Sequence, residues 1–298
     1  MRTRAWLVGV VAGLALAAPV GALTHEGGPI VKHIFPTLDA AKARGLEQGA
    51  GTDANNLIYH DGPIQRYPRV YLVFWAWLGE DPSGEAPYLQ NFFAGVGGSS
   101  WANIQTQYDE HSTFNNRGAI TNPPSQLAGV WFDDSLKWPP IPDLFIDREA
   151  QLAAQHFGDT DTDAGYIIAT PHNFNDLQFG YAYCAWHSVT TYDGAPIAYT
   201  DLPYMTDAGG ACGQNFVNNG PAGLLDGVSI VAGHEFEEMV TDPQIDAWYD
   251  SNGLENADKC AWVNNGEGAA RNIVLPTGSF AVQSLWSNAI SGCTTHHP

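Results

Sequence analysis

The stretch AGLLDGVSIVAGHEFEEMVT, residues 222–241, organises the rest of the sequence around it. Asn219-Gly220-Pro221 precedes this stretch and Pro243 follows it, a pattern that predicts a helix with proline near its first turn and a forced end. Apolar residues recur along the stretch at helical spacing, so one face is predicted to be buried. We therefore expect residues 222–241 to form a helix against the core.

Several polar side chains fall on that face. His234, Glu235, Glu238 and Asp242 lie on or beside the apolar stripe, whereas Glu237 points to the opposite side. Burying a carboxylate without a partner costs several kcal/mol, so these groups need a cation, a hydrogen-bond network or a cleft. The alternative is a half-buried helix with solvated carboxylates and an ordinary core histidine at position 234.

The helix carries the motif HExxE, which differs from the zinc-peptidase motif HExxH in its last position. Residues one helical turn apart share a face, so His234 and Glu238 are predicted to bind one metal ion. In gluzincins, which the motif resembles, a third ligand comes from a second element about twenty residues further on. Glu255 and Asp258 both lie near that distance and either could complete the set, the alternative for Asp258 being a turn-forming role. We predict Zn²⁺ there, with Ca²⁺ less favoured.

The run VYLVFWAWL, residues 70–78, has apolar side chains on both faces and predicts a central strand. Strands and helices are interspersed along the chain without a regular repeat. These features predict an α+β fold with a mixed sheet, a single zincin-like domain built around the helix. The further expected strands are 127–132, 166–170, 181–187 and 196–200, and the further expected helices are 87–96, 99–108 and 147–157.

The N-terminal residues predict export. Residues 1–22 combine a basic start, an apolar stretch and small residues before a cleavage point, as in a signal peptide. Residues 23–57 are read as a leader or a propeptide, and residues 58–298 as one extracellular domain. No later stretch is long and apolar enough for a membrane anchor, so we expect a secreted, extracellular or periplasmic protein.

Four cysteines, an even number in an exported chain, predict two disulfides with three alternative pairings. We expect Cys184 to pair with Cys212 and Cys260 with Cys293, because these pairings close the shorter loops. His187 follows Cys184 closely and is read as a packed histidine, with a place in a cleft as the alternative. The formal net charge of -20 at pH 7 disfavours nucleic acid as a partner, and the oligomeric state stays open.

Three stretches resemble the EXORDIUM or phosphate-induced family of secreted proteins, in its bacterial branch. They are YHDGPIQRYPRVYLVFW (59–75), YCAWHS (183–188) and VAGHEFEEMVTDPQIDAWYDSNGLENADKCAW (231–262). The resemblance spans residues 58–298, and its last block is the specific one. It implies a signal peptide, a single extracellular domain and, for plant members, a role in wall-associated growth.

Together these features favour a secreted zinc-dependent hydrolase, a peptidase acting on peptide or protein substrates. Glu235 would then be the catalytic general base, taking a proton from the attacking water and passing it to the leaving amine. The alternative is a non-catalytic extracellular binding or signalling protein, with a structural cation or a buried carboxylate site on the same residues.

Overall fold

The computed structural model describes residues 31–45, 55–135, 145–174 and 178–297, and residues from Val31 onward belong to one compact unit. The expected signal peptide, residues 1–22, lies outside the described residues. Helices and a mixed sheet make up this unit, so the predicted α+β class is confirmed. Among the described residues, no helix has the length and apolar character needed to cross a bilayer.

Six strands form the main sheet in the order β1-β8-β9-β7-β3-β6. Strands β6, β3, β7 and β9 run parallel, β8 is antiparallel to β9, and β1 is antiparallel to β8. Their bounds are β1 His33–Pro36, β3 Arg69–Trp75, β6 Leu127–Asp133, β7 Ala164–Ala169, β8 Tyr183–Tyr192 and β9 Ala195–Leu202.

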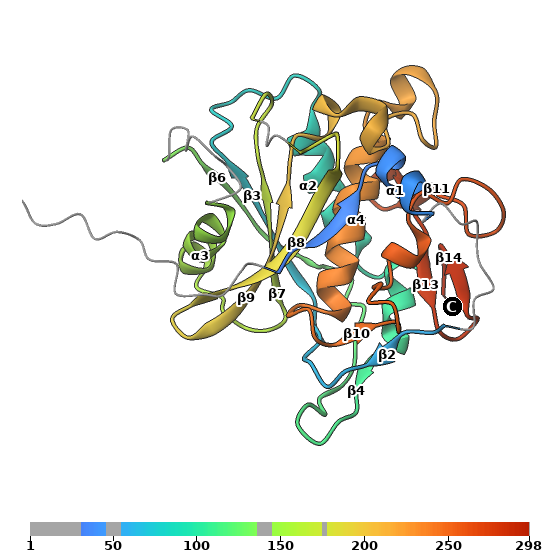
Figure 1. Cartoon of the computed structure of the whole chain (residues 1–298). Coiled ribbons are helices and arrows are strands. Elements are labelled where there is room, and N and C mark those ends of the chain that lie inside the picture. The colour runs from blue at the N-terminus through green and yellow to red at the C-terminus, as the bar shows by residue number, and fades with distance from the viewer. Residues whose placement is uncertain (1–30, 46–54, 136–144, 175–177, 298) are drawn as a thin grey trace, which may run out of the picture. The chain divides into compact units, whose positions relative to one another are not determined.

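Helices cover both faces of this sheet (Figure 1). The side chains of strand β3 alternate between two cores. Leu72 and Phe74 lie in the core that packs against α2 and α4, whereas Val73 and Trp75 lie in the core that packs against α3. A strand with apolar side chains on both faces is stable only between two layers. The predicted central position of β3 is therefore confirmed. The helices are α1 Leu38–Arg44, α2 Glu85–Val96, α3 Ile146–Phe157 and α4 Asp226–Thr241.

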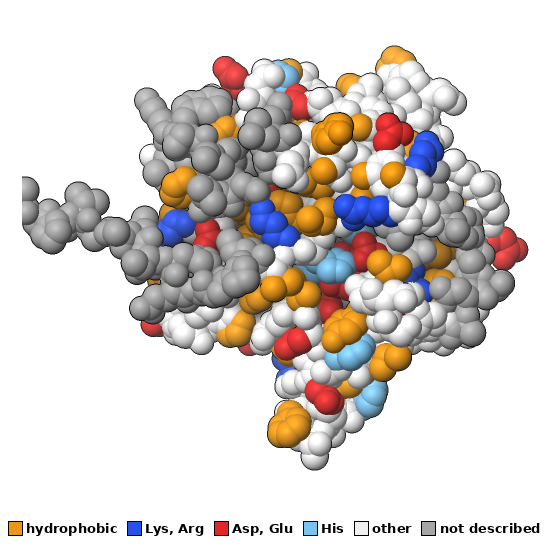
Figure 2. Space-filling view, viewed as in Figure 1, with side chains coloured by type: hydrophobic (Ala, Val, Ile, Leu, Met, Phe, Trp, Pro, Cys, Tyr) orange, Lys and Arg blue, Asp and Glu red, His pale blue; other side chains and the backbone are white. Residues whose placement is uncertain are grey.

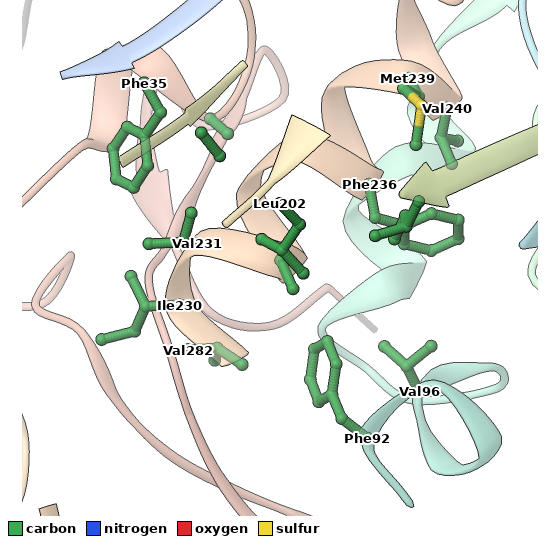
Figure 3. Close-up of a cluster of buried hydrophobic side chains, with 14 of the residues drawn as sticks. Phe35, Phe92, Val96, Leu202, Ile230, Val231, Phe236, Met239, Val240 and Val282 are labelled. Carbon is green, nitrogen blue, oxygen red and sulfur yellow. The ribbon is translucent and has the colours of Figure 1, made fainter. Parts of the chain in front are cut away.

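Helix α4 is enclosed on every side, and all 16 of its residues are buried. The sheet lies along one side, and α2, β12 and the 3-10 helix η1 cover the others. Figure 3 shows Val231, Phe236 and Val240 of α4 among side chains from these elements. Truncating a buried phenylalanine such as Phe236 to alanine typically costs about 3 to 5 kcal/mol, so the position of this helix is strongly determined.

Short elements complete the unit. Four two-stranded ribbons pair β10 with β2, β11 with β12, β13 with β14 and β4 with β5. Their bounds are β2 Ile58–Tyr59, β4 Asp109–Glu110, β5 Gly118–Ala119, β10 Trp248–Tyr249, β11 Arg271–Leu275, β12 Gly278–Val282, β13 Leu285–Ser287 and β14 Gly292–Thr294. The 3-10 helices are η1 Ala102–Gln107, η3 Met205–Asp207, η4 Gly209–Cys212, η5 Gly220–Gly223 and η6 Asp258–Cys260.

The predicted pairing of the cysteines is confirmed. Cys184 is bonded to Cys212 and Cys260 to Cys293, with Cα atoms 5.5 and 5.7 Å apart. The first disulfide ties β8 to η4, and the second ties η6 to β14.

Two local predictions were wrong. The helix begins at Asp226 and not at position 222, because the Asp226 carboxylate accepts the backbone N–H groups of Val217 and Asn218 and so holds the preceding loop against the first turn. The segment predicted as a helix over 99–108 is the shorter 3-10 helix η1. In addition, residues 33–44, within the segment interpreted as a leader or propeptide, form β1 and α1, and β1 is paired into the main sheet.

Candidate metal centre

Helix α4 carries three of the predicted site residues into the interior. His234, Glu235 and Glu238 are fully buried. Because His234 and Glu238 lie one turn apart, their side chains meet, and Nε2 of His234 is 3.1 Å from Oε1 of Glu238. The alternative of solvated carboxylates is wrong, since the whole helix is enclosed.

The chain returns to this point after the helix, as the sequence predicts. The backbone N–H of Asp258 donates to Oε1 of Glu238 at 2.9 Å, and Oδ1 of Asp258 lies 3.8 Å from Nε2 of His234. Glu255, three residues earlier, is also buried. Both predicted candidates for the third ligand therefore lie beside the helix.

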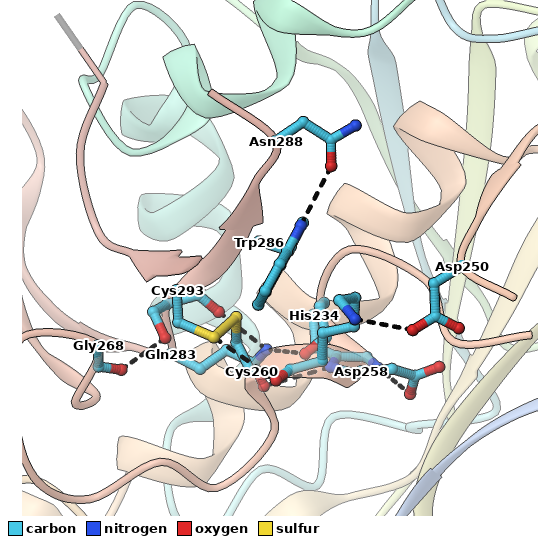
Figure 4. The surroundings of a disulfide bond; sticks show 12 residues. His234, Asp250, Asp258, Cys260, Gly268, Gln283, Trp286, Asn288 and Cys293 are labelled. Atoms are coloured by element: carbon cyan, nitrogen blue, oxygen red, sulfur yellow. Dashed lines mark hydrogen bonds and ion pairs between the residues drawn. A yellow bond between two sulfur atoms is a disulfide. The ribbon is translucent and has the colours of Figure 1, made fainter. Parts of the chain in front are cut away.

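Turns and a disulfide hold this returning segment in place. Asp250 accepts the backbone N–H groups of Asn252 and Leu254, and its other oxygen lies 2.7 Å from Nζ of Lys259. Cys260 of the Cys260–Cys293 disulfide lies two residues after Asp258, and Figure 4 shows the disulfide close to Asp258 and His234. The loop that presents Glu255 and Asp258 is thus fixed at both ends.

His187 of β8 belongs to the same cluster, so the histidine predicted to be packed also lies among the candidate ligands. Its Nε2 lies 3.4 Å from Oε2 of Glu238 and 3.4 Å from Oε1 of Glu255. The side chain is fully buried. The Cys184–Cys212 disulfide lies three residues before it on the strand, and that proximity is the one sequence signal that could have suggested a braced position.

His33 of β1 is the second residue that the sequence did not identify. Strand β1 pairs with β8 in the register His33↔His187, so the two imidazoles are neighbours, with ring centroids 5.2 Å apart. Nδ1 of His33 lies 3.4 Å from Oε2 of Glu238 and 3.5 Å from Oε1 of Glu255. No local pattern marks this residue, because its position depends on a pairing with a strand far away in the sequence.

Four atoms therefore converge on one point: Nδ1 of His33, Nε2 of His187, Oε2 of Glu238 and Oε1 of Glu255. One ligand atom from each of these residues lies within 4.8 Å of the others. None of the four atoms has a hydrogen-bond partner among residues 31–45, 55–135, 145–174 and 178–297. Buried polar atoms are normally hydrogen-bonded, so four that lack a hydrogen bond and face each other across ion-pair distances of 3.4 to 3.5 Å form a site that can hold a metal ion.

A second grouping shares Glu238 and consists of His234, Glu238 and Asp258. Here the hydrogen bonds of Gln283 define the state of His234. Nε2 of Gln283 donates to the carbonyl oxygens of Ala257 and Ser284, which leaves its Oε1 to accept from Nδ1 of His234 at 3.2 Å. Nε2 of His234 then faces Glu238 either with a second proton or with a lone pair for a cation.

The electrostatics of the cluster follow from burial and close opposite charges. Burial alone would lower the pKa of His187, but the Glu255 and Glu238 carboxylates raise it to about 10. Burial would raise the pKa of Glu238, yet His234, His187 and His33 hold it well below its usual range. The cluster therefore favours an ionised Glu238 and stabilises positive charge beside it.

Glu235, the predicted general base, lies in the same environment. Burial raises its pKa to about 8, against the opposing effects of His234 and His187. Neither of its carboxylate oxygens has a hydrogen-bond partner within the described part of the chain. Asp242, by contrast, has a structural role, because its Oδ1 accepts the backbone N–H groups of Asp246 and Ala247 after the helix.

The cluster is nearly closed to solvent. The His33 side chain is 19% exposed, whereas those of His187, Glu238 and Glu255 are 0 to 1% exposed. Figure 2 shows histidine atoms next to acidic atoms near the centre of one face. The described structure thus places a histidine between the buried carboxylates and the surface.

Comparison with protein-family models, curated proteins and solved structures found no match for this chain.

Proposed function

We propose that the protein is an exported zinc-dependent hydrolase, with peptides or proteins as substrates. The four convergent atoms carry this proposal. With zinc bonds of about 2.0 to 2.1 Å, the ligands of a tetrahedral site lie about 3.4 Å apart. The four cross distances between the two imidazoles and the two carboxylates are 3.4 to 3.5 Å. Calcium takes about six to eight oxygen ligands at longer distances, so this donor set favours zinc.

The neighbouring residues suit hydrolysis. A bound zinc ion supplies Lewis-acid chemistry, polarising a carbonyl and lowering the pKa of water. Glu235 has both oxygens free to accept a proton from the attacking water and to pass it to the leaving amine. As the C–N bond breaks, the hydroxyl group of the water would be added to the acyl carbon and its proton to the leaving nitrogen.

The disulfides support export. Structural disulfides form and persist mainly in oxidising compartments, outside the cell or in the periplasm. Both disulfides here hold segments that present site residues, β8 with His187 and η6 with Asp258. We therefore place the active protein in an extracellular or periplasmic compartment.

A second candidate function is favoured by one observation. Structural zinc sites are closed by four protein ligands, whereas catalytic sites keep one position open. His33 would supply a fourth ligand atom, since its Nδ1 lies 3.4 and 3.5 Å from the Glu238 and Glu255 oxygens. A non-catalytic extracellular binding or signalling protein with a structural zinc ion fits that arrangement.

Metal analysis combined with a hydrolysis assay separates the candidates. Purified protein is expected to contain one zinc ion per chain, and Glu255→Gln is expected to lose it, while Glu80→Gln, an exposed carboxylate, keeps it. A peptide library is then incubated with wild type and with His33→Ala, before and after chelation. Chelator-sensitive cleavage by either protein supports the hydrolase, whereas stoichiometric zinc without cleavage by either supports the structural site. Protein that binds no zinc contradicts both.

A further inference from the structure

We infer that His33 is a metal ligand and that β1 acts as an internal latch, closing the coordination position that water and substrate would otherwise use. This inference rests on the proposed zinc site. His33 would keep water and substrate away from the metal and from Glu235 for as long as β1 stays in place.

The ring of His33 is oriented for this role. Its Nε2 lies 3.4 Å from the carbonyl oxygen of Gly253 and 3.4 Å from Oδ2 of Asp258. A carbonyl oxygen only accepts hydrogen bonds, so this contact favours a proton on Nε2, and in the neutral ring that tautomer has its lone pair on Nδ1. Nδ1 is the atom that faces Glu238 and Glu255. Metal-binding histidines are commonly oriented by such a contact at the other ring nitrogen.

Strand β1 holds His33 by contacts on both sides of it. Phe35 stacks between the rings of His234 and Trp262, with centroid distances of 3.9 and 4.8 Å, and is fully buried. The indole N–H of Trp262 donates to the carbonyl oxygen of Pro36, and Oγ of Ser188 donates to that of Val31. The position of the imidazole is thus set by the strand as a whole.

The same strand lies at the edge of the sheet. Strand β1 is the last strand on its side and contacts β8 alone within that sheet. An edge strand of this kind occupies the place where an extended peptide could add to β8 by backbone hydrogen bonds. Because His33 is the one partly exposed member of the four, moving β1 is the direct route from solvent to the buried ligands.

Cobalt substitution tests the ligand without relying on activity. Full-length wild type, His33→Ala and the control His111→Ala, an exposed histidine, are loaded with Co²⁺ and titrated with azide. Four protein ligands leave no exchangeable position, so the visible spectra of wild type and His111→Ala should not respond. His33→Ala should respond, and added imidazole should restore the insensitive spectrum by filling the vacated place.

The wild-type titration alone keeps the inference falsifiable if His33→Ala does not fold. A wild-type cobalt spectrum that changes when azide is added overturns the latch, while cobalt binding still supports the metal site. Conversely, an opened His33→Ala site with no peptide cleavage supports the ligand and contradicts the hydrolase. If the hydrolase is correct, His33→Ala should cleave peptides at least about tenfold faster than wild type, a barrier lower by about 1.4 kcal/mol, because a catalytic zinc site needs one open coordination position.

Discussion

His33 and His187 are cross-strand neighbours, and this pairing brings the N-terminal segment to the metal cluster. The register of β1 on β8 aligns the two residues, with their ring centroids 5.2 Å apart. A shift of one residue would turn His33 to the other face of the sheet. The cluster therefore depends on strand register as much as on the helix that carries HExxE.

The two groupings around Glu238 predict different effects of replacing a histidine. His187→Ala removes one of four convergent ligand atoms and should weaken zinc binding at least about 100-fold, whereas His234→Ala removes a contact to the other oxygen of Glu238 and should weaken it about 10-fold. Competition with a chromogenic chelator measures both. His60→Ala, whose ring stacks on Tyr249, is the control. If His234→Ala weakened zinc binding more than His187→Ala, the ion would lie between His234, Glu238 and Asp258.

Glu235 and Glu237 offer a matched pair of buried carboxyl groups on one helix. In the His33→Ala protein, Glu235→Gln should keep the zinc and reduce kcat by about 10² to 10⁴ fold, the usual contribution of a positioned base. Glu237→Gln should leave kcat unchanged, because Glu237 faces Gln105 and not the histidine cluster. Steady-state kinetics and metal content are measured together. Equal losses in the two variants, in step with the folded fraction, would show that Glu235 is structural.

The disulfides should differ in their effect on the metal. Replacing either pair by alanine should cost about 3 to 4 kcal/mol of stability, as expected for loops of this length. Loss of Cys260–Cys293 should also weaken zinc binding, because it loosens the segment with Glu255, which is not itself part of a main-sheet strand. Loss of Cys184–Cys212 should affect zinc less, since strand pairing on both sides still holds His187. Equal changes in zinc affinity would contradict this distinction.

Glu149 of α3 should make stability depend on pH. Burial, together with the carboxylate of Asp133, raises the pKa of Glu149 to about 8 from 4.5. The folded state therefore binds a proton more tightly than the unfolded state, and stability falls as pH rises between these values, with no further loss above about 8. Glu149→Gln should be more stable than wild type at pH 9 by roughly 2 to 4 kcal/mol, since one pKa unit corresponds to about 1.4 kcal/mol.

Denaturant unfolding of chelator-treated wild type and Glu149→Gln at pH 5 and pH 9 measures this effect. The difference between the two proteins isolates residue 149 from other titrating groups. Glu80→Gln, at an exposed position, should follow wild type at both values. A difference that does not grow with pH would contradict the assignment.

Local patterns in the sequence predicted much of the fold and half of the cluster. The apolar run over 70–78 indicates a strand with neighbours on both sides, and the helix before Pro243 carries His234 and Glu238 of the candidate metal centre. Glu255 could be predicted because it lies only 17 residues after Glu238, so the segment that follows the helix soon passes beside it again. These features depend on residues close together in the sequence.

The remaining features depend on long-range packing. His33 reaches the cluster through pairing with β8, and no periodicity within residues 33–36 reveals that partner. The apolar stripe predicted one buried face and placed Glu237 on the opposite side. That side is buried as well, because η1 and β12 cover it. A helical pattern identifies the most apolar face but not how many neighbours a helix has.

The cluster combines His33 from near the N-terminus with Glu255 from the last fifth of the chain, and this separation affects how the site forms during biosynthesis. His33 contacts the carbonyl oxygen of Gly253, a residue 220 positions further on. The four-atom site cannot assemble until translation has passed residue 255, and closing so long a loop is slow compared with forming local structure. A metal ion could thus be bound by all four atoms only after the chain had folded, and a chain that had lost its C-terminal third would have no complete site.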